Sequence, residues 1–340
     1  MAAVGHPVCN LDAALVEGAR QHMTDVMQAA VSSNSDAMDY LRFSLYIAGA
    51  SDYVVTPFRV APGPQGDEAF LVFIRAHDGE WTHCGVGAAS KDENSEVLWI
   101  GVRRRIMAAP IPVKIQPGDR LSLGLTETGR PDRRAALDAY LEMPDGQVKS
   151  LQIMAFAGGN YTVNLSFPVS GKYIFELLVD TGSGLETAML LPLYAGVPVD
   201  TIPTVLPQIT DDRTAPSAML LDLINRVRVQ AKVSPLKRDA RLDAVAQDHC
   251  ADMARSGEFG HHSSRTGMLI DRLKVAALFP SLMAENVARS STVFRAHSNL
   301  MRSPSHKIRL LRTDFTHIGV GVLSTGSDVL VTEILVRWEP

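Results

Sequence analysis

Three short blocks near the C-terminus constrain this chain more than any other feature. In order they are Ala284-Glu285-Asn286-Val287-Ala288, then Leu300-Met301-Arg302-Ser303-Pro304-Ser305-His306-Lys307, and then Phe315-Thr316-His317-Ile318-Gly319-Val320-Gly321-Val322. A helical stretch that ends in Phe259-Gly260-His261-His262 precedes them. The second block has the pattern of a helix start, with serine at the N-cap and proline at the first helical position. The series constrains the fold more tightly than it constrains a reaction.

The length and composition predict a multidomain globular protein. A chain of 340 residues is about twice the usual domain size, so two or three domains are expected. Hydrophobic residues make up 46% and charged residues 21%, which is ordinary for globular proteins. A net charge of −4 gives no polyanion-binding signal, which argues against a nucleic-acid partner.

No apolar run reaches the ~18 residues that a membrane-spanning helix requires, so no transmembrane segment is predicted. Met1 to Asp12 lack the basic start and apolar core of a signal peptide. The protein is therefore expected either to be cytoplasmic or to have lost a leader. The three cysteines allow one disulfide at most, and Cys9 and Cys84 are the only pair within one predicted domain. Cys250 lies on the apolar stripe of a helix and is interpreted as an inert buried thiol.

Residues 199–216 are interpreted as a linker, because Pro203, Pro207 and Pro216 punctuate a stretch without apolar periodicity. Residues 106–198 show period-two alternation and turn signals, as in the series Leu121, Leu123 and Leu125. Several short strands at this spacing predict an all-β sandwich of immunoglobulin-like type.

The first 105 residues are predicted to be mixed α/β. Residues 11–31 and 36–47 are predicted helices, and residues 69–75 and 97–103 are predicted strands. An internal repeat lies here, because Thr82-His83-Cys84-Gly85-Val86-Gly87 copies the motif at Thr316 to Gly321.

Residues 217–340 show a well-punctuated helical pattern. Ser217 is a predicted helix cap, Asp239 caps the next helix, and Gly257 ends it. His249 lies on the apolar stripe of that second helix and is interpreted as a hydrogen-bonded structural histidine.

Together, these blocks resemble the bacterial branch of the CAP superfamily, named for cysteine-rich secretory proteins, antigen 5 and pathogenesis-related proteins. The resemblance implies a CAP (SCP-like) α-β-α sandwich over residues 217–340. Because the third block recurs near the N-terminus, residues 1–105 are hypothesised to be a reduced, degenerate CAP-like domain. The predicted fold class is therefore α+β and multidomain.

His261 is predicted to lie in the CAP cleft. Phe259, His261, Gly267 and Arg272 fit the spacing of the bacterial CAP pattern, with His262 as the alternative if the loop is shifted by one residue. Without the resemblance, His261 and His262 would be interpreted as a surface pair of histidines in a polar loop.

Glu285 sits among apolar neighbours, where an unpaired charge is costly and a carboxylate needs a partner or a raised pKa. The resemblance places it in the cleft; without the flanking blocks it would be interpreted as a helix-surface acid. Asn286 is expected to brace the turn.

His306 falls in the first turn of its predicted helix, where the helix dipole disfavours a protonated imidazole. A neutral imidazole accepts hydrogen bonds or binds a metal. A solvated histidine beside Lys307 and Arg309 is the alternative. Asn299 to Ser303 contain no second acid, which weakens any mechanism that uses two carboxylates. His317 is interpreted as structural, because His83 repeats it in a half without the other blocks.

Three functions follow from the resemblance. In the first, a secreted, periplasmic or envelope protein acts as a binding module for a protein, glycan or lipid ligand, with His261, His306 and Glu285 holding a divalent metal such as zinc. In the second, the cleft is vestigial and the protein is a scaffold. In the third, a metal-assisted hydrolase uses Glu285 as its general base. A non-enzymatic role is preferred, with a cytoplasmic location as the alternative.

Overall fold

The computed structural model describes residues 9–28, 37–77, 81–91, 93–112, 114–128, 136–182, 184–200, 215–326 and 328–339. The chain divides into two compact units, one of residues 1–179 and 186–205 and the other of residues 180–185 and 206–340. Each unit is described by itself below. Most of the predicted linker lies outside the described residues. Among the described helices none is long and apolar enough to cross a membrane.

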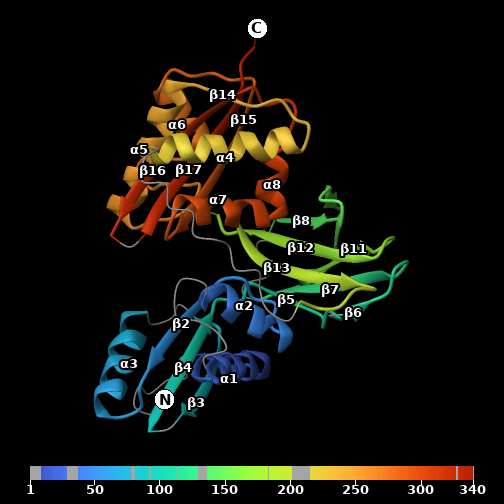
Figure 1. Cartoon of the computed structure of the whole chain (residues 1–340), viewed down its shortest axis with the longest axis vertical. Coiled ribbons are helices and arrows are strands. Elements are labelled where there is room, and N and C mark those ends of the chain that lie inside the picture. The colour runs from blue at the N-terminus through green and yellow to red at the C-terminus, as the bar shows by residue number, and fades with distance from the viewer. Residues whose placement is uncertain are drawn as a thin grey trace. The chain divides into compact units, whose positions relative to one another are not determined.

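The N-terminal part of the first unit is a four-stranded sheet with helices packed on it (Figure 1). The sheet order is β1-β3-β4-β2, and the strands are β1 (Asn10–Leu11), β3 (His83–Lys91), β4 (Asn94–Val102) and β2 (Val55–Val60). The helices are α1 (Ala13–Met27), α2 (Ala37–Ile47) and α3 (Pro64–Ala76). The Asp12 side chain caps α1 by accepting hydrogen bonds from the backbone of Ala14 and Leu15.

The predicted strand at residues 69–75 is wrong, because these residues belong to helix α3. Their run of apolar side chains fits a buried strand or a buried helix equally well. Phe70, Phe73 and Ile74 recur at helical spacing, and the Phe73 ring stacks on Phe58 of β2 with centroids 4.4 Å apart. Pro64 starts the helix at a position where its missing N–H costs nothing.

Cys9 and Cys84 form a disulfide whose Cα atoms are 5.7 Å apart. Cys9 immediately precedes β1, and Cys84 lies in β3, the parallel neighbour of β1. The bond therefore fixes the first described residue of the chain to the sheet. Cys250 is the free cysteine, and it is buried as predicted.

The rest of the first unit consists of two sheets around one hydrophobic core. One sheet has the order β10-β11-β7-β5, with strands Ile153–Ala155, Asn160–Ser166, Arg120–Glu127 and Ile106–Ala108. The other has the order β6-β13-β12-β8-β9, with strands Lys114–Ile115, Leu185–Ala195, Gly171–Asp180, Leu137–Glu142 and Val148–Leu151. Leu123 and Leu125 are buried and contribute to that core, so the predicted alternation does mark strands.

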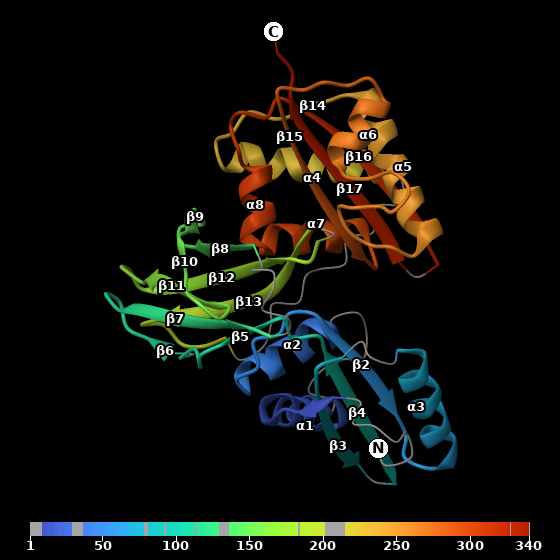
Figure 2. The ribbon, with the colours of Figure 1, turned by 180° about the vertical axis from the view of Figure 1, so that it is seen from behind.

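The second unit is a sheet with helices on both faces (Figures 1 and 2). The sheet order is β14-β16-β17-β15, with strands Lys237–Arg238, His317–Thr325, Asp328–Arg337 and Leu282–Ser290. The helices are α4 (Pro216–Gln230), α5 (Ala240–Ser256), α6 (Leu269–Val275), α7 (Val293–Arg302) and α8 (Pro304–Leu310). Ile334 and Val336 pack with α5, whereas Leu335 packs with α4 and α7. Successive residues of β17 therefore face different helical layers.

Helix punctuation in this unit follows the sequence closely. Asp239 caps α5, and Gly257 ends it with a left-handed φ of 73°. The cap of α4 differs from the prediction, because Ala215 is the N-cap and Ser217 lies inside the helix. Pro216 takes the first helical position, which moves the start of the helix two residues upstream.

The two Gly-x-Gly motifs bring a strand unusually close to a helix. A Cβ atom at Gly319 would lie 2.3 Å from Leu242, and one at Gly321 would lie 2.4 Å from Ala246, both in α5. Gly85 and Gly87 of β3 have the same relation to α1. No side chain fits at these distances, so the motif serves helix packing.

We predict that Cys9→Ser lowers the free energy of unfolding of the first unit by about 2–5 kcal/mol, because the disulfide closes a chain segment with a sequence separation of 75. Denaturant unfolding under non-reducing conditions measures the change. Cys250→Ser is the matched control in the other unit. Equal unfolding curves for wild type with and without reductant would contradict the prediction.

Candidate functional site

Glu285 is a buried carboxylate in the middle of strand β15. Its side chain is 3% exposed, and it lies opposite Ile334 on the sheet face that packs against α5. One carboxylate oxygen accepts a hydrogen bond from His261 Nδ1 at 3.0 Å. The other accepts from Arg272 Nη2 at 2.5 Å. Both oxygens are therefore engaged by protein groups.

Arg272 of α6 connects this carboxylate to the loop that carries His261. Its Nη1 donates to the backbone carbonyls of His261 at 3.1 Å and Gly267 at 2.8 Å. The sequence named Arg272 only as part of a spacing and missed this role. The spacing itself was the available signal, because it ties the arginine to His261 and Gly267.

The Glu285 carboxylate is held in its charged form. Burial alone would raise its pKa, but the hydrogen bond from His261 and the charge of Arg272 outweigh burial and leave the pKa below its usual value. Since the carboxylate accepts from Nδ1, that ring nitrogen carries the proton in a neutral His261. Nε2 is then the acceptor nitrogen of the ring.

Of the two candidate histidines, His261 contacts Glu285, and His262 is exposed. Polar contacts from α5 hold the His261 loop. His249 Nε2 donates to the Gly260 carbonyl at 2.9 Å, so His249 is hydrogen-bonded as predicted. Asp252 accepts from the hydroxyl groups of Ser263 and Thr266.

His306 lies in the first turn of α8, as predicted, with Ser303 at the N-cap and Pro304 at the first helical position. Its Nδ1 is 2.6 Å from Ser303 Oγ. Burial, with smaller effects of Arg309 and His261, lowers its pKa to about 3. The imidazole is therefore neutral near pH 7, as the sequence predicted, with burial as the largest cause.

These residues give no support to the predicted metal centre. Each Glu285 oxygen already accepts a hydrogen bond, from His261 or from Arg272, and the cationic guanidinium next to the carboxylate opposes a second cation. Among the described residues no group of three or more His, Cys, Asp or Glu side chains is placed to hold a metal ion. His306 makes no described hydrogen bond to either of the other two predicted ligands.

His317 and Asn286 both lie outside the Glu285 cluster. His317 Nδ1 is 2.9 Å from Thr316 Oγ1, and His83 makes the matching contact with Thr82. Asn286 is fully buried in β15 and donates through Nδ2 to Glu333 Oε2 at 3.0 Å. It therefore braces two neighbouring strands, where the sequence suggested a turn.

Glu333 is a second buried carboxyl group in the centre of this sheet. Burial raises its pKa to about 7, and the hydrogen bond from Asn286 lowers it by less. Glu333 Oε1 and Asn286 Oδ1 have no hydrogen-bond partner among the described residues. Glu333 alternates with Ile334 along β17, so it lies on the sheet face away from α5, whereas Glu285 lies on the α5 face.

Comparison with known proteins identifies this part of the chain. Residues 221–335 match the model of the CAP family, described as the cysteine-rich secretory protein family. The uncharacterized membrane protein YlbC of Bacillus subtilis is 33% identical over 111 residues, and the uncharacterized protein YkwD of the same organism is 30% identical over 109 residues. Each match covers 32% of this chain, and they cover 32% and 42% of the relatives' own lengths.

A solved extracellular protein with an SCP domain from Bacillus anthracis is 20% identical, with a TM-score of 0.35, over 64% of this chain and 77% of that one. The C-terminal part of this chain is a CAP domain by the family match, and Glu285, His261 and Arg272 lie within the matched residues.

We predict that Glu285→Gln destabilises the CAP domain by about 3 kcal/mol, because it leaves the Arg272 guanidinium buried without its counter-ion. Urea unfolding at pH 7 measures the effect. The matched control is Glu339→Gln, which neutralises an exposed glutamate of the same unit. If the two variants lose the same free energy of unfolding, the prediction is wrong.

Glu333→Gln should change how stability depends on pH. Between pH 4.5 and 7 the unfolded carboxyl group has lost its proton while the folded one retains it, so wild-type stability falls as pH rises. Glutamine keeps an acceptor for Asn286 but cannot ionise. We expect the stability of the variant relative to wild type to rise by about 3 kcal/mol from pH 4.5 to 7. Parallel pH profiles would refute this assignment.

Proposed function

We propose that this protein is an envelope-associated or secreted bacterial binding module, and that its CAP cleft binds a ligand without transforming it. Glu285 carries the proposal, because both of its oxygens serve Arg272 and His261. A general base works best with a pKa near the working pH, whereas the pKa of Glu285 is lowered. The group is suited to fixing His261 in one tautomer and orientation.

The surroundings of this cluster suit an amphipathic ligand. Within residues 206–340, His261 and Glu285 line a pocket with apolar side chains of Met268 to Ile270 and of Met283, and with the cationic Arg309. Met268 and Ile270 are 39% and 37% exposed. Apolar walls with a few fixed polar groups are typical of binding sites for glycans, lipids or peptides.

The location outside the cytoplasm is supported by the Cys9–Cys84 disulfide, since such bonds persist in oxidising compartments. A hydrolase is less favoured, because no second acid accompanies Glu285 in the cluster and the described residues offer no metal cluster.

The domain arrangement that goes with this proposal has three parts. Residues 1–105 are a reduced CAP-like domain that repeats the C-terminal frame, residues 106–198 are an immunoglobulin-like sandwich, and residues 217–340 are the CAP domain. The matching strand orders β1-β3-β4-β2 and β14-β16-β17-β15 support the repeat, as do the paired Gly-x-Gly contacts. Appended domains of this kind suit an interaction protein.

The full chain should co-sediment with purified peptidoglycan sacculi or with anionic phospholipid vesicles. His261→Ala and Ile270→Asp should each reduce this binding at least tenfold, because one removes a polar contact and the other places a charge on the apolar wall. The matched control is Val169→Asp, at an exposed apolar position of the first unit. Binding that is unaffected by both cleft variants would favour the scaffold function.

Two further measurements separate the alternatives. Calorimetric titration with zinc should give the same heat for wild type and for the double variant His261→Ala/His306→Ala. Zinc binding that is present in wild type and lost in the double variant would instead support a metal site at these histidines. Peptide, peptidoglycan and ester substrates should show no turnover that is lost in Glu285→Gln. If turnover is lost in Glu285→Gln at a temperature where the variant is folded, the protein is an enzyme and the binding proposal is wrong.

A further inference from the structure

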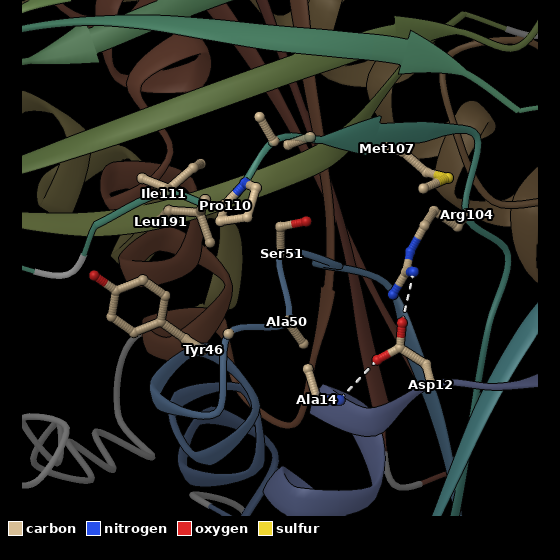
Figure 3. Close-up of a pocket in the computed structure, with 13 residues that line it drawn as sticks. Asp12, Ala14, Tyr46, Ala50, Ser51, Arg104, Met107, Pro110, Ile111 and Leu191 are labelled. Carbon is tan, nitrogen blue, oxygen red and sulfur yellow. Dashed lines mark hydrogen bonds and ion pairs between the residues drawn. The ribbon is translucent and has the colours of Figure 1, made fainter.

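The first unit contains a pocket of about 200 Å³ that lies outside the CAP domain (Figure 3). Its lining comes from the start of α1, from the end of α2 and the residues that follow it, from the segment Met107 to Ile111, and from Leu191 of β13. The volume is below the ~300–1,000 Å³ of pockets for drug-sized ligands, so its occupant is small.

One end of the pocket is a partly buried ion cluster centred on Arg104. The Arg104 side chain is 10% exposed. Its Nη1 donates to Asp12 Oδ2 at 2.8 Å, while Nε and Nη2 donate to the two carboxylate oxygens of Asp52 at 2.9 and 2.6 Å. The Asp12–Arg104 pair lies in the pocket (Figure 3), and these two are the charged residues of its lining.

Arg104 retains hydrogen-bonding capacity at this end. A guanidinium has five N–H donors, and three of them are used by Asp12 and Asp52. The other two have no partner among the described residues. Asp12 Oδ2, which accepts from Arg104, also has a lone pair to spare. The end of the pocket thus offers a donor next to an acceptor.

The charge balance of the cluster excludes most ionic ligands. One guanidinium and two carboxylates sum to a net charge of −1, which repels an anion. Arg104 in turn opposes a cation at the same place. A neutral amide matches this pair, since its carbonyl accepts from Arg104 and its N–H donates to Asp12.

The rest of the pocket is apolar. Pro110, Ile111 and Leu191 lie on the side away from Arg104, with Tyr46 below them and Ser51 between the two ends (Figure 3). The Tyr46 hydroxyl is already used, because it donates to the Pro192 carbonyl. An aliphatic group can therefore fill this end without leaving a polar group unpaired.

We propose that this pocket binds a small neutral ligand that carries an amide at the Arg104–Asp12 end and a branched aliphatic group at the other. A leucine residue within a peptide, capped by amides on both sides, has this chemistry. The proposal concerns a site in the first unit and is independent of ligand binding in the CAP cleft.

The test is a ligand-detected NMR titration of the full chain with three probes: N-acetyl-leucinamide, N-acetyl-leucine and N-acetylglycinamide. The first should saturate the site with a Kd on the order of 1 mM, as expected for a ligand of this size. The carboxylate of the second should weaken binding about tenfold or more through repulsion by the cluster. The third lacks the aliphatic group and should not saturate.

Ser51→Phe should abolish binding of N-acetyl-leucinamide, because Ser51 lines the pocket between its two ends and a phenyl ring there takes up the space of the ligand. Ser150→Phe, at an exposed position of β9, is the matched control and should bind as wild type does. If Ser51→Phe fails to fold by circular dichroism, Ala109→Phe on the exposed rim takes its place. Equal binding of amide and carboxylate, or binding that survives the filled pocket, would overturn the proposal.

Discussion

A buried carboxylate that must be neutralised organises the CAP domain. Glu285 lies in the interior of a sheet, where an unpaired charge would cost several kcal/mol. Arg272 of the short helix α6 and His261 of the preceding loop compensate for it. The same guanidinium also holds two backbone carbonyls of the loop. Removing the carboxylate would therefore loosen α6 and the His261 loop together, which is why its effect on stability and its effect on binding have to be measured separately.

The packing of a strand against a helix through a Gly-x-Gly motif occurs in both units, whereas the Glu285 cluster occurs only in the second among the described residues. In both units a strand with a Gly-x-Gly motif lies against a capped helix, and the third sequence block encodes this packing. In the second unit Glu285 lies opposite Ile334, whereas in the first unit Pro57 takes the corresponding position opposite Ile100. Proline supplies neither charge nor side-chain hydrogen bond. Phe58 and Trp99, at the register positions of Asn286 and Glu333, pack with Phe73 on the other face of the sheet. The first unit thus has the same Gly-x-Gly contact between strand and helix, with proline where the second unit has the buried carboxylate.

The sequence was informative where a local rule decides the structure. Asp239, Gly257 and the Ser303-Pro304 pair were located correctly because capping depends on a few neighbouring residues. The sequence was ambiguous at residues 69–75, because an unbroken apolar run fits a strand as well as a helix. The packing of Phe73 on Phe58 favours the helix. The engagement of Glu285 could not be derived locally either, since Arg272 and His261 reach it from separate segments. Because Arg272 and His261 engage Glu285, the structure does not support the metal site that the sequence suggested at His261, His306 and Glu285.

The residues that accompany the helix-capping aspartate differ between the two units. Val336 pairs with His317, and two residues after Val336 the second unit has Trp338, whose ring packs under the Arg241 guanidinium at 4.9 Å. Arg241 also pairs with Asp239, the helix cap. The first unit has Arg104 at the position of Trp338, and Arg104 pairs directly with the cap Asp12 and with Asp52. In the first unit Arg104 is held by two carboxylates and lines the pocket together with the cap Asp12. Space remains beside the cap, and the donors that line it are those that Asp12 and Asp52 leave unused.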